Sequence, residues 1–356
     1  MERRLEGSSG EAADCFWTRH PPGRCTMAKR IPDHSTMRAA VALAARAPSV
    51  FNTQPWQWRV DEGCLHLLLD RSRTLPVTDP LVREAILSCG AALHHACLAL
   101  SALGWHTRVH RAPDTHTPDR LATLDVASPR KPSTATLALA SAAADRRTDR
   151  REYSAEPVSA PLLDELAEAG RQAGVRVLIV ASEQRYALAR AFAKAAALHG
   201  ASEQYRNELA GWTGRSATAE EGVAEVSAPQ PGTQYGDLVL RDFGRIALTH
   251  EEAGSTHTAG TLLLISTVDD DRPAWLRTGE ATSTILCTAR RRGLGSSPLS
   301  EAFEIDRTRA AVRHEVLADR DHPQIALRLG WPPTPHDPPA TSRRAVQDLL
   351  LSHNDG

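Results

Sequence analysis

A dense group of cations, Asp145-Arg146-Arg147-Thr148-Asp149-Arg150-Arg151, is the first stretch of the chain whose residue types indicate a binding chemistry. Guanidinium groups bind phosphate in a bidentate fashion, and a hydroxyl such as that of Thr148 adds one more contact. The pattern Arg146-x-Thr148-x-Arg150 therefore indicates a phosphate site. A solvated helix end, the usual role of a charge run, is the alternative.

A second stretch, Pro48 to Trp56 (PSVFNTQPW), combines two prolines, two amides and a tryptophan. Pro48 cannot continue a helix that we expect over Ser35 to Arg46, with Ser35 as its N-cap. After Trp56 the alternating residues predict a β-hairpin. The stretch is therefore either a stiff loop anchored by Trp56 or a loop that presents polar side chains at the mouth of a sheet.

Two further segments with candidate binding residues lie next to predicted helices. Gly293-Leu294-Gly295-Ser296-Ser297-Pro298-Leu299-Ser300-Glu301 comes after a predicted helix, and its glycines fit either a helix stop or a close backbone approach to a ligand. Near the end of the chain, Thr341-Ser342-Arg343-Arg344 precedes a short predicted helix through Leu351.

Periodicity predicts the elements that must position these segments. Helices are expected over residues 80–103, 137–144, 159–170, 182–198 and 275–292, and strands over residues 57–60, 65–69, 105–112, 121–128, 175–180, 261–267 and 324–331. His94 and His95 lie in the first of these helices. A structural role is expected for this pair, with one histidine buried and one facing a cleft or solvent, because no other ligand spacing supports a metal site.

Four of these segments together resemble the FMN-dependent nitroreductase superfamily. The arginine pattern is similar to the family's R-x-S-x-R/K signature, the loop to its PSxxNxQPW segment, and GLGSSP to its GLG segment, while the terminal Arg matches in place. The resemblance covers roughly Ser35 to Leu351, without residues 200–259. It implies an α+β fold with mixed sheets flanked by helices. The cofactor-binding residues that it implies are Arg146, Thr148, Arg150, Pro48, Ser49, Asn52, Gln54, Pro298, Leu299, Ser300, Arg343 and Arg344.

In the family, the first Arg and the terminal Arg meet the FMN phosphate, the last cation of the signature lies near the pyrimidine end of the ring, and a partner subunit supplies the loop. The resemblance implies no catalytic side chain, because the flavin performs the chemistry. Thr148 replaces the commoner Ser and keeps the hydroxyl. Arg150 replaces a frequent Lys and stays protonated, so it would still favour an anionic reduced flavin.

The four segments are divided between two halves of the chain. Residues 31–144 carry the loop but no arginine signature, whereas residues 145–356 carry the arginines and the GLG segment but no second loop, residues 155–161 standing in its place. The pattern most resembles the Acg-like, actinobacterial, duplicated subfamily. It implies two tandem halves that form an intramolecular pseudo-dimer, and hence a monomer with one FMN per chain, although further association of chains stays open.

The bulk composition excludes several classes of function. The 356 residues carry a net charge of −1, which gives no electrostatic basis for binding nucleic acid or an anionic membrane. The six cysteines form no CxxC pair and no zinc spacing, so no metal is expected and a reduced, cytoplasmic protein is the simplest interpretation. Residues 1–30 have no period and are expected to be a disordered leader, with Met27 as an alternative start.

Residues 200–259 are rich in Gly, Pro, Ser and Thr and contain isolated aromatics. A segment of this length is expected to be a lid, a binding loop or a disordered region, and the aromatics favour one that packs. Two functions are therefore in competition. The first is an NAD(P)H-dependent oxidoreductase that passes hydride to a nitroaromatic, quinone or similar acceptor, and the second is an FMN-sequestering or sensing protein whose closed lid prevents turnover.

Overall fold

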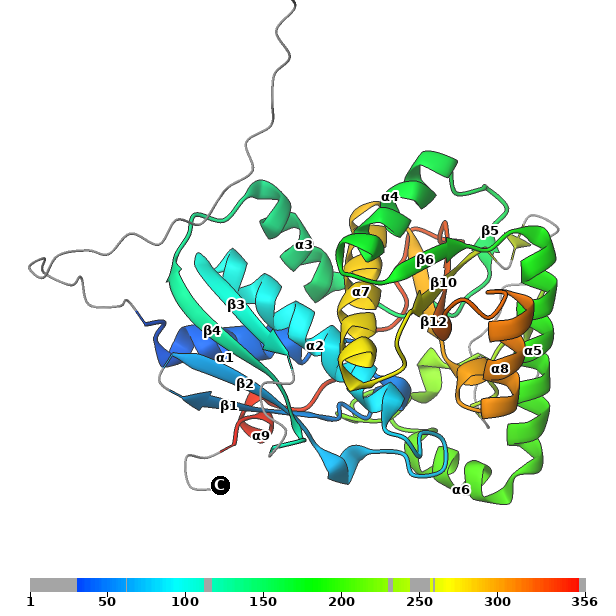
Figure 1. Ribbon diagram of the computed structural model, residues 1–356, viewed down its shortest axis with the longest axis horizontal. Helices are drawn as coiled ribbons and strands as arrows, with labels where there is room; N and C mark the ends of the chain where they lie inside the picture. Colours follow the sequence, from blue (N-terminus) through cyan, green and yellow to red (C-terminus); the bar gives the residue numbers. More distant parts are fainter. Residues whose placement is uncertain are drawn as a thin grey trace, which may run out of the picture.

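The computed structural model describes residues 31–61, 63–111, 117–229, 233–243, 257–258 and 260–351. The expected leader, Met27 and residues 244–256 of the expected lid lie outside this range. Two four-stranded sheets lie side by side, and helices α2 (Arg83–Ala102) and α7 (Arg272–Arg291) pack between them (Figure 1). The expected α+β fold with two tandem halves is confirmed.

The first sheet has the strand order β1-β2-β4-β3. Its strands are β1 (Trp56–Asp61), β2 (Cys64–Leu69), β3 (Trp105–Arg111) and β4 (Arg120–Pro129). Helix α1 (His34–Ala44) buries Met37 and Val41 in the core on this sheet. The N-cap of α1 is Asp33, whose Oδ1 accepts a hydrogen bond from the Thr36 amide at 2.7 Å, and not Ser35 as expected.

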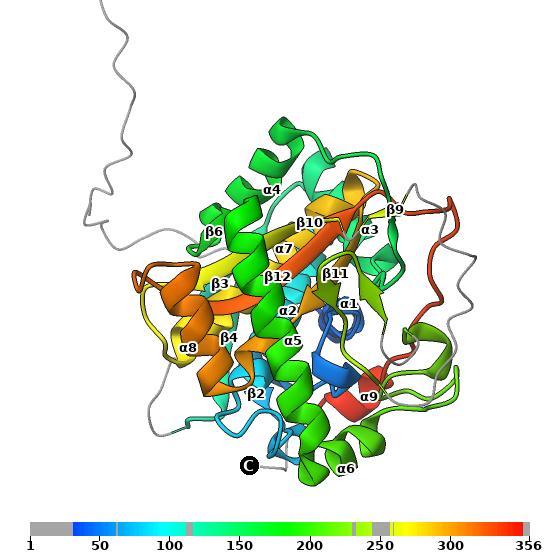
Figure 2. The ribbon, with the colours of Figure 1, turned by 90° about the vertical axis from the view of Figure 1, so that its right-hand side faces the viewer.

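The second sheet has the order β11-β12-β10-β6. Numbered along the chain within each half, the strands of both sheets follow the same order, first-second-fourth-third. Its strands are β6 (Arg176–Ile179), β10 (Thr261–Thr267), β11 (Gly295–Leu299) and β12 (His322–Gly330). Helix α5 (Ser182–Ala201) crosses the outer face of this sheet and α8 (Asp306–Glu315) lies beside it (Figure 2). The remaining elements are α3 (Thr134–Asp145), α4 (Ala160–Gln172), α6 (Glu203–Trp212), α9 (Val346–Leu349) and the short pairs β5 (Tyr153–Ser154) with β9 (His257–Thr258) and β7 (Gln234–Tyr235) with β8 (Leu238–Val239).

The expectation of mixed sheets is wrong for these two sheets. Every strand pairing in both is antiparallel. Among the described residues, parallel pairing is limited to isolated bridges. One joins Trp58 of β1 to Leu350, so the end of the chain extends the first sheet after the second sheet is complete.

The two halves meet where α2 crosses α7, at two glycines that occupy equivalent positions. A Cβ on Gly90 would lie 2.0 Å from the carbonyl oxygen of Leu276, and a Cβ on Gly279 would lie 1.9 Å from that of Leu87. Each glycine thus contacts the residue three positions before the other glycine. This reciprocal contact, together with the matching strand orders, is the geometry of a pseudo-two-fold axis.

The connection that follows the first helix differs between the halves. Residues 45–55, which include the Pro48–Trp56 loop except for Trp56 itself, join α1 to β1, whereas only residues 173–175 join α4 to β6. The equivalent of the loop therefore lies at 173–175 and not at 155–161. This connection of three residues is too short to reach across as the first-half loop does.

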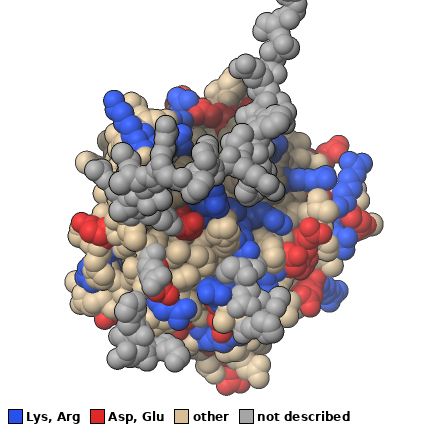
Figure 3. Space-filling view, turned by 60° about the vertical axis from the view of Figure 1, so that its left-hand side comes forward, with Lys and Arg blue, Asp and Glu red and all other residues tan. Residues whose placement is uncertain are grey.

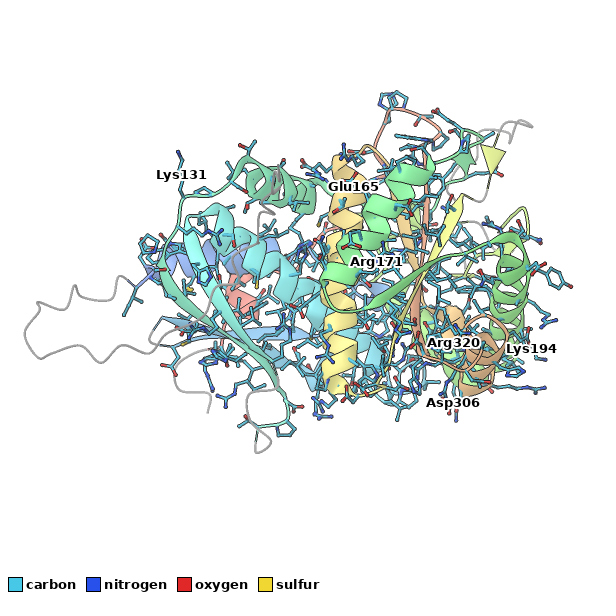
Figure 4. The ribbon with its side chains drawn as sticks, turned by 45° about the horizontal axis from the view of Figure 1, so that its top comes forward. Lys131, Glu165, Arg171, Lys194, Asp306 and Arg320 are labelled. Atoms are coloured by element: carbon cyan, nitrogen blue, oxygen red, sulfur yellow. The ribbon has the colours of Figure 1, made fainter. Side chains whose placement is uncertain are left out.

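Surface charge is mixed. Lys and Arg side chains gather near the middle of the face shown in Figure 3, with Asp and Glu beside them and at the rim. Several of the outer charges belong to ion pairs, such as that of Glu165 on α4, labelled in Figure 4, with Arg291 and Arg292 at 2.9 and 2.7 Å. Helix α2 is apolar and long enough to span a membrane by composition alone, but most of it is buried between the halves, as in the core helix of a globular fold.

Candidate active site

A cluster of arginines forms where the two halves meet. Arg146 directly follows α3 and is 4% exposed, and its Nη2 donates to the carbonyl of Arg46 at 3.3 Å. Arg343 donates to the carbonyl of Ala47 at 3.4 Å. Both cations therefore contact the backbone that leads into the Pro48–Trp56 loop, although they come from the other half of the sequence.

This cluster has more positive charge and more donors than its protein neighbours satisfy. The Nε and Nη1 atoms of Arg146 and the Nε of Arg343 are buried without a hydrogen-bond partner in the described part of the chain. Burial, together with the charges of Arg46 and Arg147, lowers the pKa of Arg146 to about 10 and that of Arg343 to about 9. Buried unpaired cations are costly, so the cluster is suited to an anionic ligand.

A cavity next to the cluster brings together most of the predicted site residues. It is enclosed by residues 48–51 of the first-half loop, by Thr148 and Arg150, by residues 297–301 and by one face of α2. Of the twelve predicted residues, those that line it are Pro48, Ser49, Thr148, Arg150, Pro298, Leu299 and Ser300. The cavity holds about 930 Å³ of space between protein atoms, part of it continuous with solvent.

The structure places the other amides of the loop behind the cavity wall. Asn52 Nδ2 donates to the carbonyls of Gly222 and Ser342 at 3.2 and 3.3 Å, and Gln54 Nε2 donates to that of Glu220 at 2.7 Å. Gln54 Oε1 accepts from the Arg344 amide at 3.0 Å. These two residues, predicted to line the ring, instead fasten the loop to two distant segments.

The loop backbone is held in an unusual conformation. Phe51, Asn52 and Gln54 have φ values of 47°, 55° and 52°, in the left-handed region that costs non-glycine residues free energy. The amide of Gln54 donates to Ser49 Oγ at 3.0 Å, which closes the loop on itself. The cross-links made by Asn52 and Gln54 offset this strain and fix Pro48 and Ser49 against the cavity.

The Arg344 side chain lies outside the arginine cluster. Its Nη2 donates to the carbonyl of Asp348 at 2.8 Å, and its Nη1 lies 3.6 Å from Asp70. Only its backbone amide contributes to the site, through Gln54. Arg46, which was not predicted from the sequence, lies in the cluster where Arg344 was expected. Its Nη2 donates to the carbonyl of Ala144 at 3.0 Å, beside Arg146.

Two residues missed in the sequence hold the segment that carries Thr148 and Arg150. Tyr153 is fully buried and donates to the Asp149 carbonyl at 3.0 Å. Arg328 on β12 lies 4.2 Å from the Tyr153 ring centroid and donates to the carbonyls of Asp149 and Arg151 at 3.0 and 2.6 Å. Arg328 stands in a strand otherwise dominated by apolar residues, which is the one sequence signal that could have found it.

The Tyr153 ring also explains the glycine of the GLG segment. A Cβ on Gly295 would lie 2.9 Å from this ring, and a Cβ on Gly330 of the neighbouring strand would lie 2.5 Å from it. The Tyr153 side chain by itself therefore accounts for a glycine at position 295. Gly293 has a φ of 82° just after α7, as in a helix stop.

Residues 203–243, within the expected lid, reach the cavity through two arginine–phenylalanine contacts. Arg150 lies 5.0 Å from the ring centroid of Phe243 and donates to the Ser227 carbonyl at 3.0 Å. In the second contact, the arginine comes from this segment and the ring from the first-half loop, since Arg241 lies 5.0 Å from the ring centroid of Phe51. Phe51 and Phe243 meet edge to face at 6.3 Å. We call these four residues the Arg–Phe quartet. Each cation–π pair of this kind contributes about 0.5–2 kcal/mol.

Arg241 also ties this segment to a buried acidic group. It pairs with Glu304, whose side chain is fully buried, and donates to the hydroxyl of Tyr205. His199 Nε2 lies 3.2 Å from Glu304. Although burial acts in the opposite direction, these neighbours lower the pKa of Glu304 to about 2. The pair therefore stays ionised at neutral pH.

Two other carboxyl groups line the cavity itself. Glu84 on α2 is 3% exposed and pairs with Arg83, and Glu301 is 4% exposed. Burial raises the pKa of Glu84 to about 7 and also raises that of Glu301. Neither residue was predicted from sequence, since a single Glu in a helix or after a strand has no distinguishing spacing.

The histidine pair has a structural role, as expected. His94 contacts the hydroxyls of Ser283 and Thr284 at 2.8 and 3.2 Å, and His95 contacts the Leu43 carbonyl at 3.1 Å. Burial lowers the pKa of His94 to about 4, so both rings join helices as neutral groups. Within the described residues, no group of three or more His, Cys, Asp or Glu could hold a metal.

The sequence was compared with known proteins. The nitroreductase family model matches residues 143–331. A Mycobacterium tuberculosis (strain ATCC 25618 / H37Rv) protein named "Putative NAD(P)H nitroreductase Rv3131" is 39% identical over 335 residues, 92% of this chain and 94% of that protein. A second protein of that strain, "Putative NAD(P)H nitroreductase acg", is 33% identical over 316 residues, 88% and 95% of the two chains. The relatives thus extend over both halves.

Among solved structures, an FMN-bound nitroreductase from Bacteroides fragilis NCTC 9343 aligns with 13% identity and a TM-score of 0.37, covering 58% of this chain and 95% of that one.

Proposed function

This chain belongs to the nitroreductase family, and from that premise we propose that it binds one FMN in the central cavity and acts as an NAD(P)H-dependent oxidoreductase on small organic acceptors. The observation that carries the proposal is the set of buried, unpartnered donors on Arg146 and Arg343 beside the cavity. A phosphate monoester is the anion that suits them, because it has the charge and the acceptor oxygens that these groups lack.

The donor set fits FMN on chemical grounds. Arg146 and Arg343, with Arg46, would hold the phosphate, and Thr148 would add its hydroxyl. Arg150, Pro48, Ser49 and residues 298–300 would surround the ring. When bound, FMN supplies hydride transfer from NAD(P)H and onward to an acceptor such as a nitroaromatic or a quinone. Arg150 maintains a positive charge at the cavity wall, since its pKa, although lowered by burial to about 10, stays above neutral pH.

One site per chain follows from the unequal connections of the two halves. The site uses the long connection of the first half and the arginines of the second. A second, symmetry-related site would need a loop from residues 173–175, which is too short to supply one. The duplicated fold thereby replaces a two-fold dimer that has two equal sites.

Sequestration of FMN with little turnover is the second candidate, and the Arg–Phe quartet favours it. Residues 239–241 and 243 form part of the cavity wall, so nicotinamide could reach a flavin there only if this segment moves. Phe243→Ala removes the contacts of this ring with Arg150 and with Phe51, leaves that of Arg241 with Phe51, and should open the wall.

The two candidates are separated by the flavin spectrum of the purified protein under anaerobic addition of NADPH. Rapid bleaching of the wild type supports the oxidoreductase. An unchanged wild-type spectrum with rapid bleaching of Phe243→Ala supports sequestration by a closed lid. A colourless protein that takes up no added FMN would overturn both.

A further inference from the structure

A second pocket lies beside the cofactor cavity, between α5, α6 and the segment 239–243. It shares only Val239, Leu240, Phe243 and Glu301 with that cavity. We call it the side pocket. Its remaining lining is Ala196, Ala197, His199, Gly200, Tyr205, Arg206, Leu209, Ala210, Thr213, Gly214 and Asp242. The walls are therefore mostly apolar, with an aromatic ring from each side.

Glu301 is a polar group of this pocket whose hydrogen-bonding capacity is unmet. It is 4% exposed, and its Oε2 atom is buried with no hydrogen-bond partner anywhere in the described ranges. A buried carboxylate without a partner costs free energy that a bound cation or donor recovers. The side chain is thus prepared for a group that the protein itself does not provide.

The nearby charges determine the sign of the missing partner. Arg241 is a cation that could pair with Glu301, but it pairs with Glu304 and donates to the Tyr205 hydroxyl. His199 also lies against Glu304, at 3.2 Å. Arg206, the arginine in the lining of the pocket, donates to the Gly200 carbonyl and is exposed. Glu301 Oε2 thus has no cation hydrogen-bonded to it within the described residues, so the pocket favours a positive ligand.

The aromatic rings favour the same sign. Tyr205 stacks on His199 with ring centroids 3.9 Å apart, and Phe243 closes the side toward the cofactor cavity. A cation beside such rings gains attraction from their π faces. Leu209 and the alanines of α5 and α6 offer an apolar surface of the size that a small hydrocarbon group covers.

We propose that the side pocket binds a small organic ammonium ion, with its charged group on Glu301 and its hydrocarbon part against Leu209 and the alanines. Glu301 also lines the cofactor cavity, but most of the lining of the side pocket is distinct from it, and the inference does not depend on the proposed function. Burial raises the pKa of Glu301, and a bound ammonium would lower it again, so binding at acidic pH should release a proton.

Calorimetric titration of the purified protein with benzylammonium tests the proposal. Benzyl alcohol is the neutral control of similar shape, and benzoate is the anionic control. We expect saturable binding of benzylammonium, at least tenfold weaker binding of benzyl alcohol, and no binding of benzoate. Equal binding of all three would overturn the assignment, because it would reveal an apolar cavity without selection for charge.

Two variants and one control locate the site. Glu301→Gln should weaken benzylammonium at least tenfold, and Ala196→Phe should abolish its binding by filling the pocket. Lys194→Phe, on the outward side of α5 where Figure 4 shows Lys194 pointing to solvent, should bind as the wild type does. Wild-type affinity in Ala196→Phe would overturn the proposal even if Glu301→Gln failed to fold. Flavin content, measured separately, reports on the cofactor proposal alone.

Discussion

Arg146 and Arg46 exchange contacts across the two halves, each guanidinium donating to backbone beside the other. Arg146 Nη2 donates to the Arg46 carbonyl at 3.3 Å, and Arg46 Nη2 donates to the Ala144 carbonyl at 3.0 Å. The two like charges are thus fixed close together without a carboxylate between them. This arrangement lowers the stability of the ligand-free protein, and a bound anion would restore that stability.

Arg146→Met should therefore have opposite effects on stability and on cofactor retention. Loss of a buried charge with two unsatisfied donors should raise the melting temperature of the flavin-free protein. The same change should weaken FMN by roughly 10- to 150-fold, since charge-assisted hydrogen bonds contribute about 1.5–3 kcal/mol. Thermal unfolding of the flavin-free protein and fluorescence titration with FMN measure the two effects.

Arg147→Met is the matched control. The Arg147 guanidinium donates to the carbonyls of Ala144 and Arg146, and burial and Arg46 lower its pKa. It contributes positive charge to the cluster but has no orphaned donor there, so a loss of only a few-fold is expected. Equal losses of FMN affinity in the two variants would show that general charge, and not the oriented donors of Arg146, holds the phosphate.

Gln54→Ala should destabilise the protein because it removes the bonds that fasten the Pro48–Trp56 loop. Its side chain joins Glu220 to Arg344, and buried partners left unsatisfied cost about 1–3 kcal/mol. Urea unfolding of the flavin-free protein measures the loss. A variant that lost FMN affinity with unchanged stability would contradict the placement of Gln54 behind the wall and favour direct contact with the ring.

Gly90→Ala tests the crossing of the two halves. The added Cβ would lie 2.0 Å from the Leu276 carbonyl oxygen, so α2 and α7 would have to separate, and we expect a loss of about 3 kcal/mol or more or failure to fold. Gly211→Ala, in α6 with open space around the position, should instead be neutral or stabilising by up to about 1 kcal/mol. Similar stability of the two variants would refute the close crossing.

Glu84 gives the stability a particular dependence on pH. Its pKa is raised from 4.5 to about 7 in the fold, mainly by burial, so the folded state binds a proton that the unfolded state releases. Its contribution to stability is therefore present below pH 4.5 and lost as the pH rises to about 7. The total is at most about 3 kcal/mol, at 1.36 kcal/mol per unit.

His94 acts in the opposite sense over part of this range, because its pKa is lowered from 6.5 to about 4, so the comparison must be made between variants. The difference in unfolding free energy between the wild type and Glu84→Gln should fall as the pH rises from 5 to 8. A difference that stayed constant with pH would mean that Glu84 titrates at its ordinary pKa.

Much of the site could be predicted from sequence where neighbouring residues act together. Arg146, Thr148 and Arg150 lie on one short segment, and Pro48 and Ser49 on another, so each set forms a contiguous motif that the family resemblance identifies. Arg46, Glu84, Arg241 and Glu301 are single residues on separate elements, and only the tertiary packing brings them to the cavity. Asn52 and Gln54 lie on the correct loop, but which way an amide points depends on partners that are distant in sequence.

The fold shows the same division between local and distant determinants. Periodic segments such as α2, α7 and β12 were predicted within a few residues, because each buries a regular apolar face. The direction of the strands within each sheet was not predicted correctly, since it depends on how the connections return across the sheet. Helix α8 was missed because its buried residues include only Thr308 and Val312, too few to produce a period.

The number of flavins per chain tests the central claim most directly. The protein should be saturated with FMN, separated from excess cofactor, and denatured, and the released flavin should be measured by absorbance against the protein concentration from amino-acid analysis. The split site predicts a ratio of one FMN per chain, falling toward zero in Arg146→Met at limiting FMN. A ratio of two would contradict the account, because residues 173–175 provide no loop for a second site.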